Sequence, residues 1–385
     1  MMGKKLMAVL FGLLVLAMPL AVGQVSAASE VSTVILVSDN AADKAIAQYL
    51  ANLTGAVIVT TTWGTYDPNV TAEILSYAPD QVVIIGGPDA VVDEYVTDLE
   101  SYNITVYRWW GANRYETDLA VIGNASKVFG IKFNATVVVA GNDSLAIQTA
   151  LRLAVQNKAA IVYVNESTNV SRIMQKLQVK EMVMVQSHTS EKVMKKVAEE
   201  LRACNCTARE VTANVSEEQV ARLLEQVRER IMAVEEIANM TNSTELKEQV
   251  REMLQLMEQA NQSLQSGNYT MAYQLALKLQ VRSEFALKEA HTEFRMAMKS
   301  NEKLKMEIEL QKIEAQVQML QKAGVNVSAI TPVLEQLKTA IQNGNYMEAK
   351  LLLKEVKKLI EEAYKGSRDV IREHHPKGGP EEPKH

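Results

Sequence analysis

The chain has 385 residues, 47% of them hydrophobic and 23% charged, which is enough for two or three domains with buried cores. Its formal net charge of -5 argues against general nucleic-acid binding, because proteins of that class are usually basic. Two cysteines exclude a disulfide-rich scaffold and a cysteine-based zinc module, and five histidines leave little material for a metal enzyme. We therefore expect neither a metal nor a cofactor, and composition alone indicates no function.

The first 27 residues have the three parts of a secretory signal. Lys4 and Lys5 precede an apolar run over 6–22, and Val25 and Ala27 are small enough for the -3 and -1 positions of a cleavage site. An uncleaved membrane anchor is the alternative, but the run is short for a span of about 20 residues and contains a proline. No later stretch reaches spanning length, so we expect a secreted chain that is soluble or held non-covalently at the cell surface.

A second pattern also indicates export. Of 21 asparagines, 15 begin an Asn-x-Ser/Thr triplet without proline at x, whereas the frequency of Ser and Thr predicts about two by chance. This excess predicts extensive N-glycosylation and favours an archaeal or eukaryotic cell surface. The candidate glycosylation sites are Asn52, Asn69, Asn103, Asn124, Asn134, Asn142, Asn165, Asn169, Asn205, Asn214, Asn239, Asn242, Asn261, Asn268 and Asn326.

The first half of the chain contains an internal duplication. Three β-branched or apolar runs recur about 100 residues later, as the pairs 33–39 and 136–142, 56–59 and 160–163, and 81–85 and 181–185. Helical stretches alternate with them, as the pairs 43–53 and 145–155, 69–77 and 170–177, and 91–102 and 191–203. This alternation predicts βαβ crossovers and parallel sheets. We therefore predict an α/β region of two tandem repeats, over 30–110 and 111–213.

Two motifs mark the end of the first copy. Residues 84–91 read Ile-Ile-Gly-Gly-Pro-Asp-Ala-Val, which predicts a strand, a tight turn and a helix that begins at the proline. Residues 108–117 read Arg-Trp-Trp-Gly-Ala-Asn-Arg-Tyr-Glu-Thr. Together the two motifs resemble the cell wall binding repeat type 2 family, over residues 30–213. The resemblance implies a non-catalytic α/β module that holds exported proteins to anionic envelope polymers, with three tandem copies packed around a pseudo-threefold axis.

This sequence departs from the family pattern. It has two copies, and in the second one residues 185–189 read Val-Gln-Ser-His-Thr where the first has its Gly-Gly-Pro-Asp element. No RxxGxxRY motif follows Val211. Two alternatives follow: a homo-oligomer that completes the arrangement, or a pair of repeats that no longer binds polymer.

The candidate polymer-binding residues come from the two motifs: Gly86, Gly87, Asp89, Arg108, Trp109, Trp110, Gly111, Arg114 and Tyr115. An arginine guanidinium suits bidentate contact with phosphate or carboxylate, and its alternative role is to pair with a local acid such as Asp89 or Glu116. Adjacent tryptophans in an extended segment point to opposite faces, so one is expected in the core while the other is free to stack on a sugar ring. The glycines are expected to supply turn conformations rather than a phosphate cradle.

No arrangement of nucleophile and base is visible. The histidines are scattered, and neither HExxH nor GxSxG occurs. We therefore expect no catalytic residue and no enzymatic activity, and an envelope hydrolase with an unrecognised site remains an alternative. Cys204 and Cys206 are too close in the chain for an unstrained disulfide, and their redox state stays open.

The second half has a helical composition. A capping box begins at 216–219, and apolar residues then recur at steps of three and four within 220–234, 306–320 and 349–363. The segment 265–272 recurs at 342–349, with a glycine past one helix and Asn-Tyr-x-x-Ala at the start of the next. We predict an all-α region of amphipathic helical hairpins or coiled coil over 214–300 and 301–365, as a compact bundle or an extended stalk. A disordered tail is predicted over 366–385.

These patterns predict an exported, N-glycosylated, non-enzymatic cell-envelope protein whose α/β repeats attach to an anionic polysaccharide or S-layer. The alternative is an adhesion or scaffolding protein that acts through its helical half. Residues 30–100 hold 11 acidic side chains and one basic one, whereas 101–213 hold 9 acidic and 14 basic ones. We therefore expect an anionic polymer on the second copy, and no nucleic-acid partner.

Overall fold

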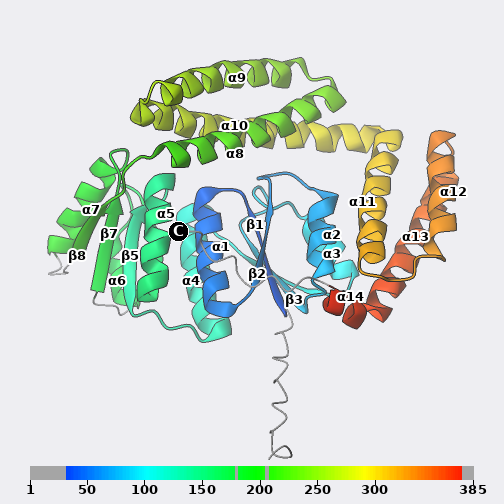
Figure 1. The fold of residues 1–385 in the computed structure, drawn as a ribbon, viewed down its shortest axis with the longest axis horizontal. Coiled ribbons are helices and arrows are strands. Elements are labelled where there is room, and N and C mark those ends of the chain that lie inside the picture. Colours follow the sequence, from blue (N-terminus) through cyan, green and yellow to red (C-terminus); the bar gives the residue numbers. More distant parts are fainter. Residues whose placement is uncertain (1–31, 178–180, 204–207, 375–385) are drawn as a thin grey trace, which may run out of the picture. The chain divides into compact units, whose positions relative to one another are not determined.

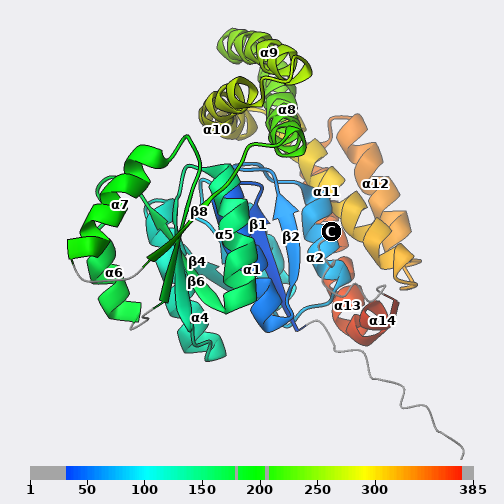
Figure 2. The ribbon, with the colours of Figure 1, turned by 60° about the vertical axis from the view of Figure 1, so that its left-hand side comes forward.

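The structure is a computed structural model that describes residues 32–177, 181–203 and 208–374 (Figures 1 and 2). The predicted signal segment, Asn205 and the pair Cys204 and Cys206 lie outside the described residues.

Two parallel four-stranded sheets form the first half, as the sequence predicts. The first pairs in the order β2-β1-β3-β4 and the second in the order β6-β5-β7-β8. Their strands are β1 (Thr33–Ser38), β2 (Val57–Thr61), β3 (Gln81–Ile85), β4 (Thr105–Trp109), β5 (Ala135–Ala140), β6 (Ala159–Val164), β7 (Glu181–Gln186) and β8 (Ala208–Thr212). The identical strand order confirms that the α/β region contains two tandem repeats.

Burial explains which strands the sequence reveals. Every residue of the central strands β1 and β5 is buried, because helices cover both faces of each sheet, and such strands read as continuous apolar runs. The edge strands β4 and β8 were not predicted. Most of their residues are exposed or half-buried, and charged side chains such as Arg108, Arg209 and Glu210 interrupt their apolar pattern.

The helices of the α/β half are α1 (Ala41–Thr54), α2 (Pro68–Ser76), α3 (Glu94–Ser101), α4 (Arg114–Phe129), α5 (Ser144–Asn157), α6 (Val170–Leu177) and α7 (Glu191–Ala203). The predicted helix start at Pro88 is wrong, because residues 88–90 form a turn and α3 begins after Asp93. The carbonyl oxygen of Val91 accepts a hydrogen bond from the Arg108 side chain, which holds this loop apart from α3. The joining helix α4 was not predicted, since its buried face includes the polar residues Thr117 and Asp118.

The second half is entirely helical where the structure describes it, as predicted. Its helices are α8 (Glu217–Thr241), α9 (Thr244–Gln265), α10 (Tyr269–Ser300), α11 (Glu302–Lys322), α12 (Ile330–Gln342), α13 (Tyr346–Gly366) and α14 (Arg368–His374). The capping box at Ser216 is present. Gly267 and Gly344 both have positive φ, of 77° and 71°, so each turn of the repeated hairpin joint uses the left-handed conformation that favours glycine.

The helical half packs against the α/β half. Helices α8–α10 share a hydrophobic core with α1, α4 and α5, whereas α11–α14 share another with α2 and α3. Tyr364 of α13, for example, packs edge-on against Tyr102, with ring centroids 5.1 Å apart. These contacts favour a compact arrangement of the helices over a stalk.

Helix α14 corrects the prediction of a disordered tail. Residues 368–374 are helical, and Ile371 is buried. Arg368 donates to the carbonyl oxygen of Pro79 at 2.7 Å, and Arg372 donates to that of Ala78 at 2.9 Å. The proline- and glycine-rich composition that suggested disorder belongs to 375–385, outside the described residues.

A buried arginine joins the two halves. Arg230 of α8 is 1% exposed, and its Nε lies 2.8 Å from Oδ2 of Asp39, directly after β1. Its Nη1 lies 3.3 Å from Oε1 of Glu284 on α10. A buried guanidinium requires such partners, because loss of one member leaves an uncompensated charge away from water.

We expect Arg230→Ala to lower the free energy of unfolding by about 3–5 kcal/mol, because two carboxylates would lose their buried cation. Urea unfolding monitored by circular dichroism measures the change. Arg228→Ala, an exposed arginine on the same helix, is the matched control and should alter stability by about 0.5 kcal/mol or less. Equal losses in the two variants would contradict the role of the buried contact.

Candidate functional site

Arg108 holds the loop that follows β3. Its Nη1 donates to the carbonyl oxygens of Gly86 and Val91 at 2.9 and 2.8 Å, and its Nη2 lies 3.1 Å from Oδ1 of Asp93. The side chain is 15% exposed, and burial lowers the pKa of the guanidinium while Asp93 raises it. Of the two predicted roles, these contacts supply the structural one, with Asp93 as the acid in place of Asp89 or Glu116.

Arg114 connects three parts of the chain. Its Nη1 donates to the carbonyl oxygen of Gly141, after β5, at 2.9 Å, and its Nη2 lies 3.8 Å from Oε2 of Glu284 on α10. The side chain remains 30% exposed, so it retains access to solvent that Arg108 largely lacks. Arg114 therefore joins the second repeat to the helical half, and its charge also lowers the pKa of Asp43 in the first repeat.

The two tryptophans separate as predicted. Trp109 is 5% exposed and packs against Phe129, with ring centroids 5.9 Å apart. Trp110 is 49% exposed, and its ring lies on the Cα of Gly87, where a Cβ would come within 2.9 Å of Cε3. Gly87 therefore leaves room for the exposed indole ring, which a Cβ would displace.

The predicted residues Gly86, Gly111 and Tyr115 shape the turns and contacts around Arg108 and Arg114, a region that we call the junction. Gly86 has φ of 122°, a conformation that favours glycine, and a Cβ on Gly111 would lie 2.2 Å from Cβ of Glu116. The ring of Tyr115 lies against Gly141, the residue that also binds Arg114. The side chain of Asp89 instead forms an ion pair of 2.8 Å with Lys288 of α10. Whether this junction binds polymer stays a prediction.

Polar groups at the carboxyl end of the first sheet face the helical half. In addition to its contact with Arg230, Asp39 accepts from the backbone N–H of Trp63 at 3.0 Å. Asn40 donates to Oε1 of Glu284 at 3.0 Å. Ligands of open α/β sheets commonly bind at this edge, where the strand order reverses. Here side chains of α8 and α10 occupy it.

The second sheet has a matching arrangement at its carboxyl end. Asp143, after β5, accepts from Ser187 Oγ at 2.6 Å and also from Ser190 Oγ, both after β7. Tyr273 of α10 donates to Oδ1 of Asp143 at 3.3 Å and accepts from the backbone N–H of Leu145 at 2.9 Å. Helix α10 thus covers the carboxyl edges of both sheets.

Two buried acids lie between the repeats. Burial raises the pKa of Asp43 from 3.8 to about 6; Arg114 lowers the pKa and Glu284 raises it further. Burial also raises the pKa of Asp118 well above its usual value. A hydrogen bond from the Tyr163 N–H lowers this pKa, and the nearby carboxyl of Asp43 raises it. Oδ1 of Asp118 has no hydrogen-bond partner among the described residues. The surroundings thus favour the neutral form of both carboxyls.

The predicted glycosylation positions reach solvent. Of the 14 sequon asparagines in the described part of the chain, 11 are exposed, and Asn124, Asn165 and Asn261 are half-buried. The one buried asparagine in that part, Asn40 at 4% exposure, does not begin a sequon. Glycan attachment is therefore sterically compatible with the fold, and occupancy stays a prediction.

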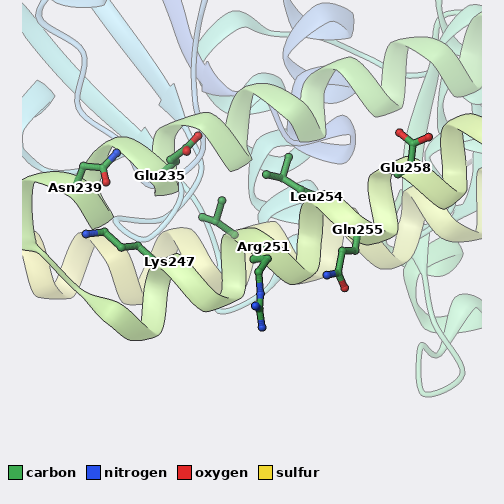
Figure 3. Close-up of a pocket in the computed structure, with 8 residues that line it drawn as sticks. Glu235, Asn239, Lys247, Arg251, Leu254, Gln255 and Glu258 are labelled. Carbon is green, nitrogen blue, oxygen red and sulfur yellow. The ribbon is translucent and has the colours of Figure 1, made fainter.

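Figure 3 shows an open depression of about 570 Å³ between α8 and α9. Its lining mixes charges of both signs with Leu254 and Val250 and includes the sequon residue Asn239, whose glycan would cover the depression. Within the described residues, no group of three or more His, Cys, Asp or Glu side chains is placed to hold a metal ion. No described helix combines the length and apolar character needed to cross a membrane.

Arg230, Glu284 and Asp39 were not among the residues predicted for the site. The sequence does indicate that Arg230 is unusual. It lies seven residues after Leu223 and three after Val227, so it falls on the buried face of α8, where an apolar side chain is expected. Asp39 and Asn40 follow a buried parallel strand directly, where side chains face the ligand edge of a sheet. Glu284 has no such signal.

No protein-family model matches the chain. It is 40% identical over 182 residues to the uncharacterized protein MJ0755 of Methanocaldococcus jannaschii; the match covers 46% of this chain and 52% of that protein. The chain thus spans about half the length of the curated relative that it matches.

Two solved structures from Clostridium difficile are weakly similar to the fold. Cwp6 is 22% identical with a TM-score of 0.37, over 47% of this chain and 28% of that one. Cwp8 is 21% identical with a TM-score of 0.41, over 52% and 33%. Likenesses of this strength do not assign a function.

We expect Gly111→Ala to lower the free energy of unfolding by about 2 kcal/mol or more, because a Cβ there would overlap Glu116 and force the turn after β4 to move. Urea unfolding measures the loss. Gly123→Ala is the matched control: a Cβ at Gly123, within α4, meets no atom within 4 Å. It should be neutral or stabilise the chain by about 0.5–1 kcal/mol. Equal effects at both glycines would disprove the steric explanation.

We expect Asp43→Asn to change how stability depends on pH. A pKa raised from 3.8 to about 6 means that the folded chain binds more protons than the unfolded chain between these values, so the parent loses stability as pH rises through this window. The amide cannot ionise, so above pH 6 the variant should be more stable than the parent by roughly 1–3 kcal/mol. At pH 4 this advantage should vanish. Urea unfolding from pH 4 to 8 tests the prediction, and a constant difference at all pH values would contradict it.

Proposed function

We propose that this chain is an exported, N-glycosylated, non-enzymatic protein of the cell envelope, which attaches non-covalently to an anionic surface polymer or S-layer through its α/β repeats. The observation that supports it most is the sequon excess combined with accessibility: none of the described sequon asparagines is buried. An excess of this size is expected where glycans are attached during export.

Charge and motif support the attachment role. The basic second copy attracts anions, and the two motifs of the first copy resemble an envelope-binding repeat. Helix α10 contacts the carboxyl edges of both sheets, and α8 adds Arg230 to the first, so polymer has to approach where such an edge stays accessible. At the carboxyl edge of the first sheet, Trp110, directly after β4, and Arg114 on α4 remain accessible.

A second candidate function is scaffolding through the helical half. Met347 and Leu351, one turn apart on α13, are 77% and 72% exposed, and exposed apolar side chains at this spacing are typical of helix contacts between chains. In this alternative the chain forms homo-oligomers or binds another surface protein. Light scattering of the purified chain distinguishes it, because attachment alone does not require a stable oligomer.

Fractionation of native cells with glycopeptide mapping tests the proposed function. We expect the chain in the envelope fraction, with glycan masses on several sequon peptides, and purified chain should sediment with isolated envelopes. Raised salt should weaken that sedimentation, since ionic contacts with an anionic polymer are screened. A chain that is unmodified and stays in the soluble fraction would rule out the proposal.

A further inference from the structure

Two large aromatic rings remain exposed on neighbouring parts of the fold. Trp110, directly after β4, is 49% exposed, and Phe285 on α10 is 69% exposed. Neither ring is needed at the surface for packing, and each would stabilise the chain more if it were buried. They come from the α/β half and the helical half respectively.

Ion pairs between their chain neighbours connect the two segments that carry these rings. Trp110 rests on Gly87, two residues before Asp89, which binds Lys288 at 2.8 Å. Lys288 lies three residues after Phe285, on an adjacent part of the α10 surface. Arg114, four residues after Trp110, lies 3.8 Å from Glu284, the residue before Phe285.

This combination suits a charged sugar. A pyranose ring has an apolar face of C–H groups, which packs on aromatic rings, and a rim of hydroxyls that need hydrogen-bond partners. Asp89 and Lys288 are 66% and 56% exposed, and exposed ion pairs of this kind contribute little to stability. They can therefore exchange partners with sugar hydroxyls or acidic groups at small cost.

A protein partner suits the same surface less well. Stable interfaces bury about 800 Å² on each partner around an apolar, charge-depleted centre. Here charged side chains accompany both rings along the chain: Lys288 and Glu284 lie within three residues of Phe285, and Arg114 lies four residues after Trp110.

We propose that Trp110 and Phe285 form a composite surface that packs against saccharide units of the envelope polymer, with Arg114 and Lys288 facing its acidic groups. This inference rests on the proposed function and adds that the helical half supplies part of the polymer site. It assigns α10 a direct role in attachment.

The test uses the full mature chain and isolated envelopes. Trp110→Ala and Phe285→Ala should each weaken co-sedimentation by about 3- to 10-fold, the loss expected for one aromatic contact. Met232→Ala is the matched control, because this side chain is 59% exposed on α8, and it should not change binding.

A conservative variant separates stacking from folding. Trp110→Phe keeps an aromatic ring on Gly87, so it should bind within about 3-fold of the parent. Solubilised envelope polysaccharide should shift the tryptophan emission of the parent chain but produce a much smaller shift in Trp110→Phe, which keeps only Trp63 and Trp109.

The outcomes distinguish the inference from the function on which it rests. If the parent chain fails to sediment with envelopes, the proposed function is wrong, and this inference with it. If the parent sediments and both aromatic variants bind as the Met232→Ala control does, this inference is wrong and the proposed function stands. Loss of binding in Met347→Ala alone would place the attachment surface on α13 and overturn the composite site.

Discussion

The buried contact of Arg230 with Asp39 and Glu284 is the constraint on which the rest of the structure depends. A guanidinium that is 1% exposed has no water to stabilise it, so its two carboxylates must stay within hydrogen-bond distance. Asp39 follows β1, Arg230 lies on α8 and Glu284 on α10, so this one requirement fixes two helices over the carboxyl edge of the first sheet. Tyr273 extends the same helix α10 over the second sheet through its contact with Asp143.

This arrangement changes where a ligand can bind. Parallel sheets usually offer a crevice at their carboxyl edge, where the strand order reverses. Here the chain fills that place with its own side chains, and Arg108 is bound by backbone carbonyls of the neighbouring loop. Of the motif at 108–117, Trp110 and part of Arg114 therefore stay accessible, whereas Arg108 is largely buried.

The sequence predicts the architecture because buried parallel strands and amphipathic helices leave regular apolar patterns. Those patterns disappear at edges: β4 contains Arg108, and α4 buries Asp118, so neither shows the periodicity of its type. The candidate site was predicted in part, since local motifs identify Gly87 and Trp110. Glu284 could not be assigned to it, because it meets Arg114 only through folding across more than 150 residues, and no local spacing encodes that contact.

The placement of the sequons is consistent with a ligand surface that includes α10. Fourteen of the 15 sequons precede Tyr269, and Asn326 is the exception. Among the described residues, the four most exposed large apolar side chains, Met347, Leu351, Phe285 and Met296, all lie on α10 and α13, in the part of the chain with few sequons. A glycan shields the surface around its asparagine, so attached glycans would shield parts of the α/β half and of the hairpin of α8 and α9. They would leave the α10 surface that carries Phe285 open to a partner.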